Sequence, residues 1–75
     1  MILKTYDFHG LDVNQAASKI TLALLELDNN QHYQQIKLIV GQGQIVRQVV
    51  IDYLEKEGYE WKFETGNFGA IIVTR

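Results

Sequence analysis

The sequence predicts an α/β domain of the α+β type, a two-layer sandwich with the order βαβαββ. Short apolar runs that favour strands alternate with stretches in which apolar residues recur at helical spacing. Near the C-terminus, aromatic and charged residues alternate with a period of two, which is typical of a strand. Because strand–helix–strand units cross over with one hand, we expect two helices on one face of a mixed sheet, with the other face partly exposed.

The first half of the chain predicts a strand, a helix and a second strand. Ile2 to Phe8 is an apolar, β-favouring run. Asp12 is placed to cap a helix that reaches roughly to Asp28, and Asn29-Asn30 ends it. Ile36 to Val40 is a short β-branched run bounded by glycine, as expected of a buried parallel strand. The apolar face of the helix comprises Val13, Ala16, Ala17, Ile20, Leu24 and Leu27.

The second half predicts a helix followed by a hairpin. The apolar stripe of this helix comprises Val46, Val49, Val50, Tyr53, Leu54 and Glu57. Gly58 stands where a left-handed C-terminal cap is required. The aromatic residues of 59–64 alternate with charged ones; they could stack bases, but the alternation favours burial. We expect a turn at Thr65-Gly66-Asn67. Ala70 to Thr74 is apolar on both faces and therefore belongs inside the sheet.

Composition limits the function and the location. The 75 residues are enough for one domain, residues 1–75, with a single core. The chain has no cysteine, so we expect neither a disulfide framework nor a thiolate metal site, and the simplest location is cytoplasmic. We expect no membrane partner, because no apolar stretch is long enough to cross a bilayer. The formal net charge of −2 requires that any nucleic-acid contact be local.

An acid–base pair is expected where the first strand ends. Asp7 and His9 are two positions apart, so in an extended segment their side chains project to the same side, about 6.5 Å apart. A carboxylate beside an imidazole can hold its tautomer and raise its pKa, which suits proton transfer near neutral pH. The alternative is structural: Asp7 stabilises a turn, and His9 caps the following helix or bonds to the backbone.

A candidate anion site is expected at the same edge of the sheet, where parallel strands lead into helices. Gly41-Gln42-Gly43 joins the second strand to the second helix and can expose backbone N–H groups to an anion. Arg47 lies in the first helical turn, where a cation is mildly unfavourable, so its position suggests a ligand or partner. The alternative is a tight turn that uses glycine for its backbone freedom.

These motifs resemble those of the small MutS-related, or Smr, domain family. Tyr6-Asp7-Phe8-His9-Gly10 is similar to the family's Leu-Asp-x-His-Gly box, and Gly41-Gln42-Gly43 is similar to its Gly-x-Gly box. The resemblance extends to Arg47, to Tyr53-Leu54 and to Gly69, and it covers nearly the whole chain. It implies a fold similar to the C-terminal domain of bacterial translation initiation factor 3. In that fold the sheet has four strands, with the last strand between the second and the third.

The resemblance also implies a function. Family members bind DNA or RNA, and several are nicking endonucleases or endoribonucleases, with roles in DNA repair or recombination. By similarity, Asp7 and His9 would be catalytic. The phosphate or nucleic-acid contacts would come from Gly10, Gly41, Gln42, Gly43 and Arg47. No protein metal site is implied, although cleavage of DNA would be helped by a divalent cation, Mg²⁺ or Mn²⁺.

Two positions differ from the family pattern and leave alternatives open. Val40 stands where the family usually has Thr or His, and Gln42 where it usually has Lys or Arg. The chain is therefore either an endonuclease or a catalytically inactive module of the same fold that binds nucleic acid or protein. The site offers about two or three phosphate contacts, which would give weak binding. A tethered neighbouring domain or a homodimer would therefore be needed for useful affinity.

Overall fold

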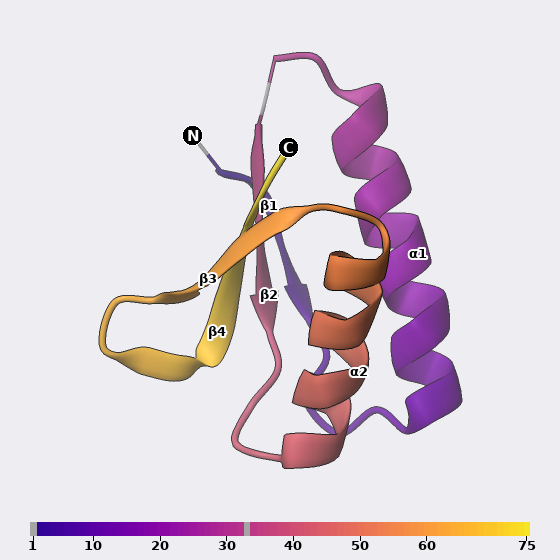
Figure 1. Ribbon diagram of the computed structural model, residues 1–75, viewed down its shortest axis with the longest axis vertical. Helices are drawn as coiled ribbons and strands as arrows, with labels where there is room; N and C mark the ends of the chain where they lie inside the picture. Colours follow the sequence, from indigo (N-terminus) through magenta and orange to yellow (C-terminus); the bar gives the residue numbers. More distant parts are fainter. Residues whose placement is uncertain (1, 33) are drawn as a thin grey trace.

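A computed structural model describes residues 2–32 and 34–75, so Met1 and Tyr33 lie outside the described part. The elements are β1 (Ile2–Asp7), α1 (Val13–Asn29), β2 (Gln35–Ile39), α2 (Gln44–Lys56), β3 (Glu60–Glu64) and β4 (Asn67–Thr74). Both helices lie on one side of the sheet (Figure 1). The predicted order βαβαββ and the two-layer class are confirmed.

The last strand occupies an internal position in the sheet. The strand order is β1-β2-β4-β3, with β1 and β2 parallel and β4 antiparallel to both of its neighbours. Ile71 of β4 lies opposite Leu38 of β2 and Phe63 of β3. This confirms the prediction that the strand with two apolar faces lies inside the sheet. It also confirms the position between the second and third strands, which the family resemblance implies.

The core lies between the sheet and the helices. Its largest fully buried side chains are Phe8, Ile20, Leu27, Ile36, Leu38, Leu54, Ile71, Val50 and Val73. Trp61 and Phe63 lie opposite Val73 and Ile71 and pack against this cluster. These two rings contact each other edge to face, with centroids 5.4 Å apart. The alternating aromatic residues are therefore partly buried and pack against the core, as the alternation predicts.

Local signals in the sequence set the helix ends. The Asp12 side chain accepts a hydrogen bond from the Gln15 backbone N–H at 2.8 Å, and the Gln15 side chain accepts one from the Asp12 N–H at 3.0 Å. This reciprocal pair starts α1. Gly58, with φ of +79°, provides the left-handed residue predicted after α2. Among the described residues, neither helix combines the length and apolarity that a membrane crossing needs.

The hairpin differs from the prediction. Asn67 was expected in the turn, but it is the first residue of β4, which begins three positions before the predicted Ala70. The register shifts between Phe63 and Glu64, so that Glu64 lies opposite Asn67 and only Thr65 and Gly66 remain in the turn. An irregular pairing of this kind cannot be recognised from alternation of side chains. The other element ends fall within two residues of the expected positions.

The burial pattern predicts that truncating a core side chain strongly lowers the free energy of unfolding. Leu38 on β2 is fully buried, so Leu38→Ala should lower the free energy of unfolding by about 2–5 kcal/mol, measured by urea denaturation. A domain of this size has little more than about 3–5 kcal/mol of stability, so much of this variant should be unfolded without denaturant. Leu22 on α1 is 60% exposed, and Leu22→Ala is the matched control, with an expected change within about 0.5 kcal/mol. Equal losses would contradict the assigned core.

Candidate functional site

The candidate site lies where β1 and β2 lead into the two helices. The turn after β1 and the loop between β2 and α2 line a hollow of about 530 Å³ that is open to solvent. It is lined by His9, Gly10, Leu11, Val40, Gly41, Gln42, Gly43 and Val46. The structure therefore brings together His9, Gly10 and the whole Gly41 to Gly43 loop, which are more than thirty positions apart in the sequence. This edge is where ligands usually bind in open α/β sheets.

Asp7 holds the turn that carries His9. Its carboxylate accepts a hydrogen bond from the His9 backbone N–H at 2.8 Å, so it bonds to the main chain and not to the imidazole. The Asp7 backbone carbonyl accepts a hydrogen bond from Lys19 Nζ at 2.6 Å. Phe8, between the two polar residues, is fully buried and anchors the turn in the core. This geometry matches the structural interpretation of Asp7 and makes it a positioning group for His9.

The backbone conformation of Gly41 favours glycine, and the residue lies against His9. Its φ is +70°, a backbone conformation that costs a residue with a side chain about 1–2 kcal/mol. A Cβ atom at position 41 would also lie 3.4 Å from Cδ2 of His9, against the edge of the imidazole. The positive φ therefore favours glycine at position 41, and the position lies in contact range of the His9 ring, so the two halves of the site are neighbours.

The start of β4 determines where the Gly41 to Gly43 loop lies. The Gly69 carbonyl accepts hydrogen bonds from the backbone N–H groups of Val40 at 2.8 Å and Gly41 at 3.1 Å. These two amides are thus used within the fold. The amides at the start of α2 have no such partner among the described residues. The N-cap residue of α2 is Gly43, which has no side chain to accept hydrogen bonds from the amides of the first turn. The positive end of the α2 dipole is therefore open at the hollow, unlike that of α1.

Arg47 lies one turn inside α2, behind the loop and outside the lining of the hollow. Its Nη2 donates to the Gln42 carbonyl at 3.3 Å. Its Nε is buried and has no hydrogen-bond partner in the described part of the chain. The guanidinium therefore braces the loop and adds positive charge beside the open helix terminus.

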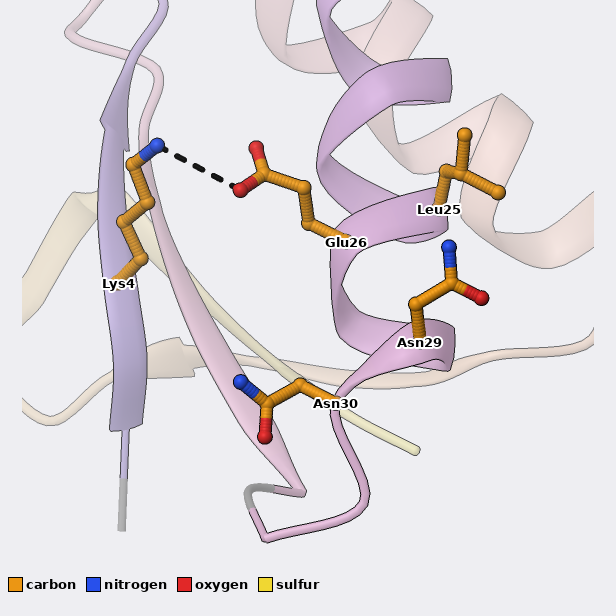
Figure 2. Close-up of a pocket in the computed structure, with 5 residues that line it drawn as sticks. All are labelled: Lys4, Leu25, Glu26, Asn29 and Asn30. Atoms are coloured by element: carbon orange, nitrogen blue, oxygen red, sulfur yellow. Dashed lines mark ion pairs between the residues drawn. The ribbon is translucent and has the colours of Figure 1, made fainter.

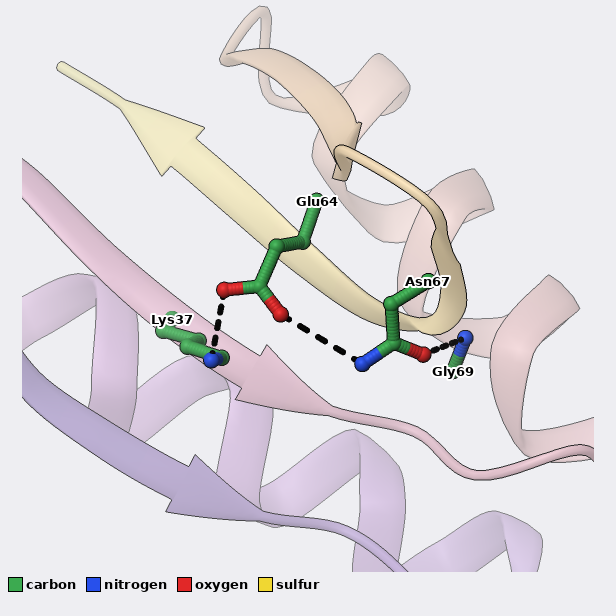
Figure 3. A network of polar contacts seen from close by, with 4 residues as sticks. All are labelled: Lys37, Glu64, Asn67 and Gly69. Carbon is green, nitrogen blue, oxygen red and sulfur yellow. Dashed lines mark hydrogen bonds and ion pairs between the residues drawn. The ribbon is translucent and has the colours of Figure 1, made fainter.

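A polar network on the open face of the sheet supports the same loop (Figure 3). Lys37 on β2 reaches across β4 to Glu64 at the end of β3, with Nζ 2.6 Å from Oε2, and this hydrogen bond lowers the pKa of Glu64. Glu64 Oε1 accepts from Asn67 Nδ2 at 3.3 Å, and Asn67 Oδ1 accepts from the Gly69 N–H at 2.9 Å. The network therefore orients the residue whose carbonyl holds the Gly41 amide.

Sequence reasoning missed the residues that support the site from outside its lining, which are Lys19, Lys37, Glu64 and Asn67. Lys19 and Asp7 are 12 positions apart, and Lys37 and Glu64 are 27 positions apart, so no local pattern links these pairs. Only Asn67 carried a signal, as a short polar residue after glycine in a turn, and that signal indicated a turn rather than a support for Gly69.

A second hollow lies far along α1 from the candidate site. It has a volume of about 340 Å³ and lies between β1 and the C-terminal end of α1 (Figure 2). Lys4 Nζ lies 3.6 Å from a carboxylate oxygen of Glu26, and both side chains are about half exposed. An exposed ion pair of this kind contributes little to stability. The arrangement adds nothing to the chemistry of the candidate site.

The described residues offer few ligands for a metal ion. In residues 2–32 and 34–75, no three His, Asp or Glu side chains lie close enough to hold an ion together. Asp7 and Asp12, the carboxylates nearest His9 in the sequence, each accept a backbone N–H. A divalent cation that takes part in cleavage would draw most of its ligands from nucleic-acid phosphates and water, as Mg²⁺ commonly does.

Comparison with known proteins agrees with the motifs. The family model of the Smr domain matches residues 6–74. The crystal structure of the Smr domain of Thermus thermophilus MutS2 is 23% identical, has a TM-score of 0.85, and the match covers 96% of each chain. The human small-MutS related domain is 21% identical, with a TM-score of 0.72, and the match covers 92% of this chain and 96% of that one. At these identities the two structures show a shared fold. A search among curated proteins found no match.

The close approach of Gly41 and His9 predicts the effect of a single methyl group. Gly41→Ala should destabilise the domain by about 1–2 kcal/mol through its positive φ and should also shift the NMR signals of the His9 imidazole. Gly58→Ala is the matched control, because Gly58 has φ of +79° with open space around its Cβ position. It should cost a similar free energy without moving the His9 signals. Identical imidazole spectra in both variants would contradict the assigned contact.

Proposed function

The chain belongs to the Smr domain family, whose members generally bind nucleic acid, and we propose that this domain binds the phosphate backbone of DNA or RNA. The observation that carries the proposal is the hollow between His9 and the Gly41 to Gly43 loop, onto which the uncapped N-terminus of α2 opens. Backbone N–H groups at a helix N-terminus, with a cation behind them, suit an anion such as a phosphate.

Electrostatics make this contact local and weak. The formal net charge is −2, so binding depends on the α2 terminus and Arg47 rather than on a broad basic surface. Two or three phosphate contacts predict a salt dependence with a slope of about −2 to −3. A tethered neighbouring domain or a second copy of the chain would raise the affinity by effective concentration.

Arg47 provides the test of the phosphate site. Arg47→Ala should weaken binding to labelled oligonucleotides by roughly ten-fold and reduce the salt slope by about 1, measured by fluorescence anisotropy. Arg47→Lys should keep the slope, because it keeps the charge. Lys56→Ala removes the same charge at the other end of α2 and should leave binding unchanged. Equal losses in the Arg47→Ala and Lys56→Ala variants would show that charge alone, not this site, drives binding.

The same site supports phosphodiester cleavage. With RNA, the His9 imidazole takes the proton of a 2′-hydroxyl and the 2′-oxygen forms a bond to phosphorus. The bond from phosphorus to the 5′-oxygen breaks, and this oxygen takes a proton from water, which gives a cyclic phosphate and a free 5′-hydroxyl. With DNA, the nucleophile is water, and a divalent cation bound to the phosphate would lower its pKa. The open α2 terminus would stabilise the charge that develops on the phosphate. Asp7 acts in this scheme as a positioning residue, because it bonds to the backbone of His9.

Cleavage is tested with supercoiled plasmid and structured RNA, each with and without Mg²⁺ or Mn²⁺. His9→Ala should reduce cleavage by about 10²–10⁴-fold, the usual contribution of a general acid or base. Asp7→Asn keeps an oxygen that accepts the His9 N–H and should retain most of the activity. Equal cleavage by the wild type and the His9→Ala variant would contradict the role of His9 as a general acid or base. A role in DNA repair or recombination predicts that the domain binds or cleaves the plasmid DNA as well as RNA.

A binding module without turnover is the second candidate, and two residues favour it. The Val40 side chain is only 2% exposed, so it provides no polar group where the family usually has Thr or His. Gln42 Nε2 lies near Gly69, 3.3 Å from the place of a Cβ atom there, and carries no charge where the family usually has Lys or Arg. The loss of these groups weakens transition-state stabilisation. Binding that depends on Arg47, without product under any metal condition, would identify this function.

A further inference from the structure

Phe68 is a mostly exposed aromatic side chain, one position before Gly69 in the chain. It lies near the start of β4 and is 65% exposed. Its ring meets the ring of Phe63 almost perpendicularly, with centroids 5.2 Å apart and an angle of 88° between the planes. Phe63 in turn contacts Trp61 and packs against the core. Phe68 therefore packs against the core cluster on one side, through Phe63, while most of its surface is exposed.

Phe68 is joined in the chain to a residue that contacts the Gly41 to Gly43 loop. The next residue, Gly69, has the carbonyl that accepts the Val40 and Gly41 amides. A Cβ atom at Gly69 would lie 3.3 Å from Gln42 Nε2 and 3.4 Å from the Gly41 carbonyl oxygen. The Cα atoms of Phe68 and Gly69 are about 3.8 Å apart, so the backbone of Phe68 is one residue away from the loop.

The chemistry of Phe68 distinguishes it from the other exposed apolar residues. In the described part of the chain the remaining large exposed apolar side chains are Val13, Leu22, Leu25 and Ile45, all aliphatic. An exposed aromatic ring offers a flat π-face, on which any nucleic-acid base can stack with little dependence on sequence. In a regular duplex the bases are already stacked on each other and are not available to such a ring.

We propose that Phe68 is a stacking platform for an unpaired base, which makes single-stranded or locally unpaired nucleic acid the substrate class of this domain. The proposal rests on the proposed phosphate-binding function of the Gly41 to Gly43 loop. The loop holds the backbone without regard to pairing, and Phe68 discriminates between paired and unpaired bases.

The binding test compares a single-stranded oligonucleotide with a blunt duplex of the same sequence, each as RNA and as DNA. Stacking contributes about 1–3 kcal/mol per base, so Phe68→Leu should weaken single-strand binding by roughly 5- to 150-fold. Duplex binding should change by less than about two-fold. Phe68→Trp keeps a π-face and should bind the single strand at least as well as the wild type. Thermal unfolding of each variant checks that loss of the Phe63 contact has not unfolded the domain.

A fluorescence measurement tests stacking directly and does not depend on the leucine variant. Trp61 is the only tryptophan, so Trp61→Phe combined with Phe68→Trp places a single indole at the proposed platform. Single-stranded oligonucleotide should quench its emission. The control combines Trp61→Phe with Leu22→Trp, which places the indole at a 60% exposed position on α1, and its emission should not change.

The outcomes separate the two proposals. Loss of single-strand binding in Phe68→Leu with duplex binding retained, together with quenching at position 68, supports the platform. Equal effects on both ligands, no effect on either, or unquenched emission overturns the platform and leaves the phosphate site standing. If the wild-type domain binds neither ligand, both proposals fail.

Discussion

The hydrogen bonds that the Gly69 carbonyl accepts from Val40 and Gly41 are the contacts on which the arrangement of the candidate site depends. They form because β4 is inserted between β2 and β3, which brings the start of the last strand against the end of the second. With those amides held, Gly41 can adopt its positive φ beside the His9 imidazole. The network of Lys37, Glu64 and Asn67 then reaches Gly69 from the open face of the sheet. Backbone geometry, rather than a cluster of charged side chains, therefore builds the site.

The two helices begin in different ways: side chains cap the N-terminus of α1, whereas in the described part of the chain no side chain caps the N-terminus of α2. Asp12 and Gln15 satisfy the N-terminus of α1 within the chain, so that end has a purely structural role. The N-terminus of α2 begins at Gly43 and faces the hollow, with Arg47 behind it. A protein with a formal net charge of −2 can in this way present one local positive region to a phosphate. The proposed phosphate binding therefore depends on a few groups.

The roles of the two residues in the first motif are unequal. Asp7 bonds to the backbone N–H of His9, and its own carbonyl accepts from Lys19, so it sets the course of the chain into α1. His9 is left as the group able to exchange a proton at the hollow. Val40 and Gln42 add neither a hydroxyl nor a charge there, which makes turnover the more demanding part of the proposed function and binding the less demanding part.

The sequence by itself determined the element order, the helix ends at Asp12 and Gly58, the internal position of the last strand and the edge at which His9 meets the glycine loop. These features follow from periodicity, capping and the shared direction of parallel strands, which are local or topological rules. Only the tertiary structure decided which group donates a hydrogen bond to the Asp7 carboxylate. Both the backbone amide and the imidazole of His9, two positions away, are close enough in the sequence to do so. The tertiary structure alone revealed the Lys37 to Glu64 contact, which joins residues 27 positions apart on β2 and β3, and the exposed ring of Phe68. The Lys37 to Glu64 contact depends on β4 lying between β2 and β3, and side-chain exposure depends on the packing of the whole domain, so neither is encoded in a local pattern.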